Sequence, residues 1–207
     1  MAVLDLRPFP VTRNPGRRVP QLAAGLVLYG ASMALMVRAS LGLDPWDVLH
    51  EGLTKHVPLS FGVITAITGV AVLLLWIPLR QRPGIGTVAN VVVIAVAVDV
   101  ALAWIPAPGR LLWQIVMLVG GVVLNGVATA AYVGARLGPG PRDGLMTGFA
   151  ARTGRPVWLV RTSLEITVLA CGWLLGGTVG VGTVLYALAI GPLAQLFLPL
   201  FAVRERS

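Results

Sequence analysis

The chain has 207 residues, of which 57% are hydrophobic and only 12% are charged. A soluble domain carries about a quarter charged residues, so this composition excludes an ordinary soluble protein and predicts an integral membrane protein. The net charge of +8 could suit nucleic acid, but the chain lacks a surface pattern of aromatic and basic residues, so no nucleic-acid partner is expected.

Residues 1–20 are rich in Arg and Pro and are expected to form a cytoplasmic tail. Six apolar stretches follow, each close to the roughly 20 residues that an α-helix needs to cross a bilayer. Residues 204–207 are expected to form a short cytoplasmic end. The predicted spans comprise residues 21–40, 60–79, 86–106, 111–134, 157–176 and 182–203.

The sequence contains an internal repeat. When the chain is shifted by 96 positions, residues 25–100 align with residues 121–196 without a gap. Glycine and proline determine backbone geometry, so their coincidence predicts two units of the same fold, residues 21–106 and 107–203. The informative matches are Gly25/Gly121, Gly30/Gly126, Gly42/Gly138, Pro45/Pro141, Asp47/Asp143, Gly52/Gly148, Gly84/Gly180, Gly86/Gly182 and Thr87/Thr183.

Each unit holds three predicted spans, and this odd number places the second unit in the membrane upside down relative to the first. The charges favour the same arrangement: with both chain ends in the cytoplasm, 12 of the 16 Lys and Arg residues lie on that side. We therefore expect an all-α polytopic membrane protein, with six transmembrane helices in a 3+3 inverted-topology repeat. The four exceptions are Lys55, Arg110, Arg38 and Arg161.

A matched motif follows the first span of each unit, at residues 41–49 and 137–145. Asp44 or Gly140 stands at a helix N-cap position, and a proline follows at the first helical position. The motif therefore predicts a short helix in each unit, at residues 45–55 and 141–152. Acidic residues in the first turn would stabilise the helix dipole, or the short helices could be re-entrant or gate elements, one on each face. The cap or gate candidates are Asp44, Asp47, Asp143 and Arg142.

A second matched motif opens the third span of each unit, as Gly84-Ile-Gly-Thr87 and Gly180-Val-Gly-Thr183. Its amide groups could bind an anion, but close helix packing is the favoured interpretation. In the fourth span, Gly126, Ala130 and Gly134 form a stripe of small residues. Such a stripe lets helices pack closely, either between the units or between protomers, so a homodimer is compatible with the sequence.

Charged residues inside the spans break the symmetry of the repeat. Arg38 and Asp99 of the first unit correspond to Gly134 and Gln195, and Arg161 and Glu165 of the second correspond to Thr65 and Gly69. Because a charge in the membrane needs a partner or a wet cavity, the hypothesis is two ion pairs, Arg38–Asp99 and Arg161–Glu165. The alternative is that Asp99 and Glu165 carry protons or cations along a solute path. The path candidates are Asp99, Glu165, Arg161, Arg38, Gln195 and Asn125.

Few residues suggest other chemistry. His50 and His56 lie too far apart for the zinc-protease helix motif and are expected to face the outer water. The single cysteine, Cys171, cannot form an internal disulfide and is expected to be a packing residue. The sequence contains no phosphate-binding loop, nucleophile elbow or metal cluster, so neither an enzyme nor a cofactor is expected.

The motifs at residues 37–47 and 137–148, with the two Gly-x-Gly-Thr helix starts, resemble those of YczE-like bacterial membrane proteins, which are related to the YitT group. The resemblance spans about residues 20–203. It implies a multi-span protein of the bacterial plasma membrane, and it implies neither a substrate nor catalytic residues.

The inverted repeat favours a permease for a small solute or ion, working by alternating access between the two units. The expected partners are the lipid bilayer and that solute. The alternative is a membrane scaffold without transport activity that assists a partner enzyme or an export system.

Overall fold

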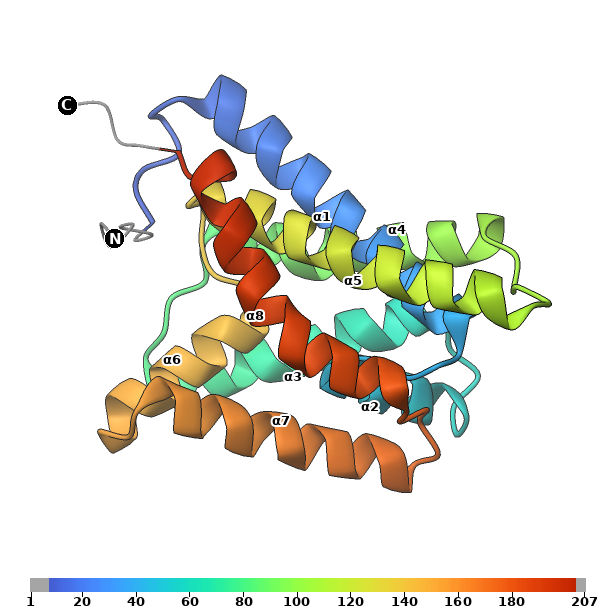
Figure 1. Ribbon diagram of the computed structural model, residues 1–207. Coiled ribbons are helices and arrows are strands. Elements are labelled where there is room, and N and C mark those ends of the chain that lie inside the picture. The colour runs from blue at the N-terminus through green and yellow to red at the C-terminus, as the bar shows by residue number, and fades with distance from the viewer. Residues whose placement is uncertain (1–7, 204–207) are drawn as a thin grey trace.

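The computed structural model describes residues 8–203, and within that range the chain forms eight α-helices. Figure 1 shows them as one helical bundle, with both ends of the described chain on the same side. The helices are α1 (Pro15–Ala39), α2 (Pro45–Thr54), α3 (Phe61–Leu79), α4 (Ile85–Trp104), α5 (Leu111–Gly134), α6 (Pro141–Thr153), α7 (Val157–Leu174) and α8 (Val181–Phe201).

Six of these helices are long and apolar enough to cross a membrane, namely α1, α3, α4, α5, α7 and α8. They coincide with the six predicted spans, and the two short helices α2 and α6 lie where the loop motifs predict them. The chain is therefore a polytopic helical membrane protein. The main difference is that α1 begins at Pro15, inside the segment expected to be a tail, because Pro is well suited to the first turn of a helix.

The two halves have the same order of elements. Each of the helices α5 to α8 begins 96 residues after its counterpart among α1 to α4. The counterparts α1 and α5 pack against each other in antiparallel directions. Gly25 near the start of α1 lies against Tyr132 near the end of α5, and the equivalent Gly121 lies against Met36. A Cβ atom at either glycine would come within 2.8 Å of these neighbours, so the close crossing requires small residues at both points.

The two matched motifs interlock across the halves. The Gly182 amide at the start of α8 donates to the Leu41 carbonyl at 2.8 Å, and the Gly86 amide of α4 donates to the Leu137 carbonyl at 2.9 Å. Gly42 follows Leu41 with φ of +117°, a conformation that favours glycine. The Gly-x-Gly-Thr segments therefore serve helix packing, as predicted.

The short helices pack across the halves as well, because α2 lies against α7 and α6 lies against α3. The side chain of Trp76 on α3 occupies the space beside Gly144 on α6, and its Nε1 donates to the Pro141 carbonyl at 3.0 Å. On the opposite side, Gly172 of α7 fits against Val48 and Leu49 of α2. Each half therefore supplies a long helix that supports the short helix of the other.

One contact breaks this symmetry. Helix α3 packs along α4, whereas their counterparts α7 and α8 make no extended contact. In Figure 1, α7 and α8 lie close at the loop that joins them and diverge toward the side of the two termini. A Cβ atom at Gly62 on α3 would lie 2.1 Å from the Ala95 carbonyl oxygen on α4. The residue equivalent to Gly62 is Trp158, which cannot make this approach.

Candidate functional site

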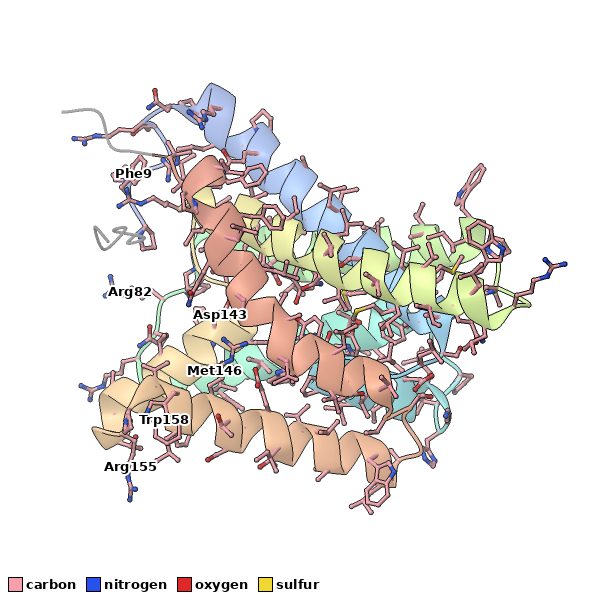
Figure 2. The ribbon with its side chains drawn as sticks, in the orientation of Figure 1. Phe9, Arg82, Asp143, Met146, Arg155 and Trp158 are labelled. Atoms are coloured by element: carbon pink, nitrogen blue, oxygen red, sulfur yellow. The ribbon has the colours of Figure 1, made fainter. Side chains whose placement is uncertain are left out.

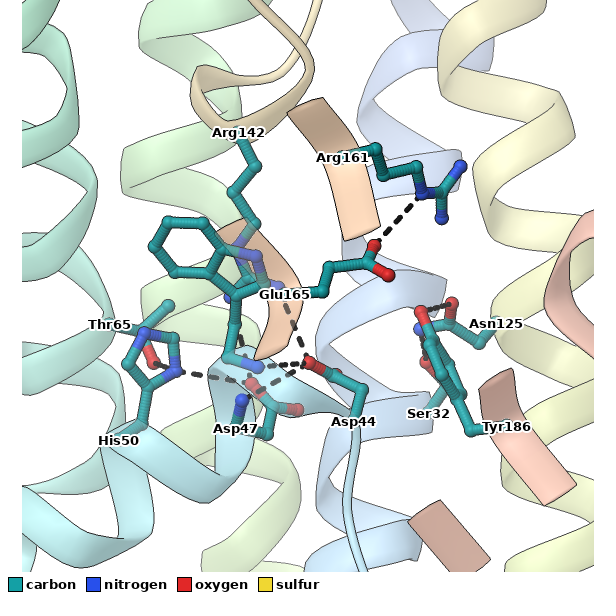
Figure 3. Close-up of polar contacts among 11 residues, drawn as sticks. Ser32, Asp44, Asp47, His50, Thr65, Asn125, Arg142, Arg161, Glu165 and Tyr186 are labelled. Atoms are coloured by element: carbon teal, nitrogen blue, oxygen red, sulfur yellow. Dashed lines mark hydrogen bonds and ion pairs between the residues drawn. The ribbon is translucent and has the colours of Figure 1, made fainter. Parts of the chain in front are cut away.

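The first turns of the two short helices meet inside the bundle (Figure 3). Arg142, the second residue of α6, places Nη1 3.6 Å from Asp44 Oδ1 and Nη2 3.7 Å from Asp47 Oδ1. Their far ends point to opposite sides, since Lys55 after α2 contacts the Gly176 carbonyl and Arg152 of α6 contacts the Pro78 carbonyl. Both helices therefore start at the centre of the bundle and run outward to opposite sides.

Local sequence explains how α2 presents its carboxylates. Asp44 caps the helix, and its Oδ1 accepts hydrogen bonds from the amides of Trp46 and Asp47 at 2.9 and 3.1 Å. Pro45 occupies the first helical position, where a missing amide hydrogen has no cost. Asp47 then lies in the first turn, close to the positive end of the helix dipole. The predicted cap is confirmed, and it directs two carboxylates at Arg142.

His50 belongs to the same cluster. Its side chain is 1% exposed, which corrects the expectation that it faces the outer water. His50 Nδ1 lies 3.1 Å from Asp47 Oδ1 and 3.3 Å from Thr65 Oγ1, and the Thr65 hydroxyl donates to the Phe61 carbonyl at 2.9 Å. The Nδ1–H group therefore donates to Asp47. The signal in the sequence was the spacing of three residues from Asp47, which places both side chains on one face of α2.

Burial changes the titration of these groups, which lie outside the six spanning helices. Burial, followed by the neighbouring charge of Asp47, raises the pKa of Asp44 to about 7. Burial also raises the pKa of Asp47, although Arg142 acts against it. The pKa of His50 falls to about 3, first because burial disfavours the charged ring and then because Arg142 repels it. His50 is therefore neutral at physiological pH.

A cavity of about 70 Å³ adjoins the cluster, between α2, α3, α4 and α6. Its volume suits a few water molecules or a small ion rather than a large solute. Both repeat units contribute to its walls, and most of its polar groups come from residues that the sequence did not single out. The polar and aromatic lining residues are Tyr29, Trp46, His50, Thr65, Thr68, Asn90, Tyr132, Arg142 and Asp143.

Several buried atoms around this cavity have no hydrogen-bond partner within the described part of the chain. They are Trp46 Nε1, His50 Nε2, Asp44 Oδ2 and Asp47 Oδ2. Trp46 and His50 line the cavity and are 6% and 1% exposed. Buried polar groups in proteins are nearly always satisfied, so one unpartnered donor and three unpartnered acceptors indicate a site for water, protons or a ligand.

Two further polar contacts extend the site. Tyr132 on α5 donates to Asp143 Oδ2 at 2.7 Å, which holds the first turn of α6. Asn125 lies fully buried on α5, where its Nδ2 donates to Ser32 Oγ at 2.8 Å and its Oδ1 accepts from Tyr186 at 3.1 Å. Asn125 thus joins α1, α5 and α8 near the cluster rather than lining the cavity.

Of the two ion pairs predicted inside the spans, one forms and one does not. Arg161 Nε donates to Glu165 Oε1 at 2.9 Å, so this predicted pair forms, and Arg161 lies within electrostatic range of Asp143 and Tyr186. The predicted pair Arg38–Asp99 is wrong. Asp99 accepts from Ser60 Oγ at 2.5 Å and from the Gly62 amide at 2.7 Å, because the exposed amides at the start of α3 lie closer to it.

The remaining candidates lie away from the cavity. Arg38 on α1 donates to the Leu102 carbonyl near the end of α4. Gln195 is exposed on α8 and is not among the residues that line the cavity. Figure 2 shows Arg82 and Arg155 on the side of the two termini, with Asp143 lying further in. The sequence thus identified the acidic first turns and Arg142, but the charges in the spans lie outside the cavity.

Comparison with known proteins places the chain in a family. The model of a "Family of unknown function (DUF6198)" matches residues 16–199. The chain belongs to this family. An uncharacterized protein of Haemophilus influenzae is 39% identical over 181 residues, covering 87% of this chain and 83% of that protein. The uncharacterized membrane protein YczE of Bacillus subtilis is 35% identical over 178 residues, covering 85% and 83%.

A more distant relative is the uncharacterized protein YyaS of Bacillus subtilis, 24% identical over 180 residues that cover 85% of this chain and 90% of that protein. No solved structure matches the chain. The resemblance to YczE is confirmed, and the relation to the YitT group stays a prediction.

Proposed function

We propose that this protein is a permease for a small solute or ion, working by alternating access between two inverted repeats in the bacterial plasma membrane. The observation that carries the proposal is the cavity beside Arg142, Asp44 and Asp47. It is polar, it lies where the first turns of two short helices meet, and its walls come from both units. Transporters place their substrates at such sites, where broken or short helices end inside the bundle.

The inverted arrangement rests on two lines of support. Six candidate spans divide into three per unit, and the counterparts α1 and α5 run antiparallel through equivalent glycine contacts. The side of the termini carries Arg82 and Arg155, as a cytoplasmic side would under the positive-inside rule. The proposal therefore puts both chain ends in the cytoplasm.

The proposal accounts for the difference between α3 and α4, which are in contact, and α7 and α8, which make no extended contact. The contact between α3 and α4 forms the outer closure in this proposal, while α7 and α8 diverge toward the side of the two termini. Arg142 retains 24% of its side-chain exposure, whereas Asp44 and Asp47 behind it are buried. In the opposite state, α7 and α8 would close and α3 and α4 would part.

Purified full-length protein in proteoliposomes tests the proposal. Uptake of a panel of small solutes, comprising ammonium, alkali cations, halides, short carboxylates and small amino acids, is measured with and without an imposed pH gradient. We expect one class to cross faster than in protein-free liposomes. Arg142→Gln should lower that flux at least about tenfold, since it unbalances a buried site, while the exposed Arg82→Gln should keep it.

No flux for any member of the panel, together with reproducible copurification of a partner enzyme or export component, would contradict the permease and favour the scaffold. Equal loss of flux in Arg142→Gln and Arg82→Gln would also count against the proposed site.

A further inference from the structure

The cluster where α2 and α6 meet has unequal numbers of charges. Asp44 and Asp47 are 1% and 0% exposed, and Arg142 is the cation that faces both. His50 adds no charge, because burial keeps its ring neutral. If both carboxylates were ionised, one negative charge would remain uncompensated in a site shielded from water, which is strongly unfavourable. A single proton on the carboxylate pair removes that charge.

The structure has places for this proton. Oδ2 of Asp44 and Oδ2 of Asp47 are both buried and unpartnered, while each Oδ1 accepts the hydrogen bonds described above. His50 connects this pair to the cavity: its Nδ1 contacts Asp47, and its unpartnered Nε2 belongs to a side chain that lines the cavity. The imidazole ring therefore links Asp47, which Nδ1 contacts, to the cavity, where Nε2 has no partner.

We propose that Asp44 and Asp47 share one transferable proton, that His50 relays it between the cavity and Asp47, and that this proton is the coupling ion of the permease. The role as coupling ion rests on the proposed function, whereas the proton site itself does not. Arg142 holds the pair by loose contacts, longer than a hydrogen bond, so it can shift as the pair gains or loses its proton.

The relay conserves every atom. Hydronium in the cavity donates a proton to His50 Nε2 and leaves water, while His50 Nδ1–H passes its proton to Asp47. The ring stays neutral overall and carries its hydrogen on Nε2. Release runs in reverse: Asp47 returns the proton to Nδ1, and Nε2–H gives its proton to water, which restores the first tautomer. Uptake and release then differ only in which side of the membrane the cavity faces.

The charged and titratable groups around the pair come from several helices. Arg142 of α6 and Tyr29 of α1 act electrostatically on both carboxylates, whereas Glu51 of α2 acts on Asp47 and Tyr186 of α8 acts on Asp44. Helix α3 contributes the neutral Thr65, and the charged residues of α7 form the Arg161–Glu165 pair. Arg142 is the permanent cation that faces the carboxylates, so its removal should have the largest effect.

Infrared spectroscopy of the full-length protein in lipid nanodiscs measures the proton directly, through the C=O stretch of a protonated carboxyl group. An ordinary carboxyl has a pKa near 4 and is ionised at about pH 6. We expect the wild type to show a band at that pH equal to about one of its eight Asp and Glu side chains. No band in the wild type at about pH 6 would overturn the proposal.

Three variants distinguish this pair from other carboxyl groups. Asp44→Asn and Asp47→Asn should each abolish the band, because the remaining carboxylate is then balanced by Arg142. Arg142→Gln should increase it about twofold, since both carboxylates lose their cation. The control Glu165→Gln should leave the band unchanged, because Glu165 lies outside the cavity and pairs with Arg161. A band that persists in both Asn variants, or that disappears in Glu165→Gln, would assign the proton elsewhere.

Kinetics test the relay. After a pH jump, His50→Gln should reach the same band intensity at least about tenfold more slowly, because the imidazole path is lost. His56→Gln is the matched control, since His56 is exposed on the loop after α2, and it should behave like the wild type. Equal rates in both variants would overturn the relay. A band without proton-driven flux of any panel solute would leave the proton site standing and overturn its coupling role.

Discussion

Asp99 makes the interface between α3 and α4 different from the equivalent interface between α7 and α8. It projects from α4 to the start of α3, where it accepts hydrogen bonds from Ser60 and from the Gly62 amide. Charge-assisted hydrogen bonds at a helix N-terminus are among the stronger ones in proteins. In the second unit Gln195 is the equivalent of Asp99, and Pro156 and Trp158 are the equivalents of Ser60 and Gly62. Proline has no hydroxyl to donate, and the large side chain of Trp158 does not allow the close approach that Gly62 makes.

Asp99→Ala should therefore lower the free energy of unfolding by about 1–2 kcal/mol, the usual cost of a lost N-cap. Thermal unfolding in detergent measures the change. Glu165→Ala is a matched control, because its partner Arg161 is 49% exposed, and it should cost less than about 1 kcal/mol. The double variant with Arg38→Ala should be additive, since Arg38 contacts the Leu102 carbonyl. Strong coupling between Arg38 and Asp99 would contradict this assignment.

The predicted ion pair between Arg38 and Asp99 does not form. It was predicted because the two residues have opposite charges and similar depths in the membrane, but a hydropathy pattern does not reveal that amides at the start of α3 can bind the Asp99 carboxylate. The pair Arg161–Glu165 was predictable because both residues share one helix, so their distance follows from the spacing of four. The role of His50 was not predicted, because its distance from His56 in the sequence excludes a zinc motif without indicating the contact with Asp47.

At the scale of helices, the two Gly-x-Gly-Thr motifs connect one half of the fold to the other. Leu41 and Leu137 offer carbonyls at the end of a first span, and the glycines at the start of α8 and α4 bring amides to them. A Cβ atom at Gly182 would lie 2.5 Å from the Gly42 carbonyl oxygen, so no larger residue fits there without moving α8. The repeated motif was visible in the sequence, but the carbonyls of Leu41 and Leu137 that accept its hydrogen bonds were not predictable from it.

Gly182→Ala should destabilise the protein, because α8 must shift away from the Leu41 segment and lose the bond from the Gly182 amide. Gly191→Ala on the same helix is the control. A Cβ atom there meets nothing within 4 Å, so the better helix propensity of alanine should stabilise the protein by up to about 1 kcal/mol. Unfolding temperatures of the two variants should therefore move in opposite directions. A decrease of equal size in both would show that α8 tolerates no alanine in general.

The existence and bounds of the short helices were predictable from their caps, while their meeting at the centre was not. Caps are local, and Asp44, Pro45 and Pro141 define them without reference to the rest of the chain. The relation of α2 to α6 depends on how the two halves of the chain pack together. Their first turns meet inside the bundle, where Arg142 faces Asp44 and Asp47.

At the scale of the whole molecule, the two repeat units differ in one interface between helices. Helices α3 and α4 are in contact, and α7 and α8 diverge toward the side of the termini. In the proposed alternating-access cycle, exchange of these two arrangements between the copies moves access to the cavity from one side of the membrane to the other. At the position equivalent to Gly62 the second copy carries Trp158, so closure of α7 onto α8 needs a different contact there.

Opening the α3–α4 seam should therefore expose the cavity to the outer side. We consider a Thr68→Cys reporter in a Cys171→Ser background, since Thr68 lines the cavity and Cys171 is the single native cysteine. In cells, a membrane-impermeant thiol reagent should label this reporter poorly from outside. Adding Gly62→Ala places a Cβ atom 2.1 Å from the Ala95 carbonyl oxygen, a backbone atom that cannot move aside alone, so α3 must part from α4.

Outside labelling of the reporter should then rise several-fold, whereas labelling in opened vesicles should stay similar. Gly69→Ala is the control on the same pair of helices. Its Cβ atom would meet the side chain of Val91 at 3.1 Å, and a side chain can give way without separating the helices. If Gly62→Ala and Gly69→Ala raised outside labelling equally, or neither did, the α3–α4 seam would not be the outer closure. A rise confined to Gly62→Ala would tie access to the one close contact that the second copy cannot form.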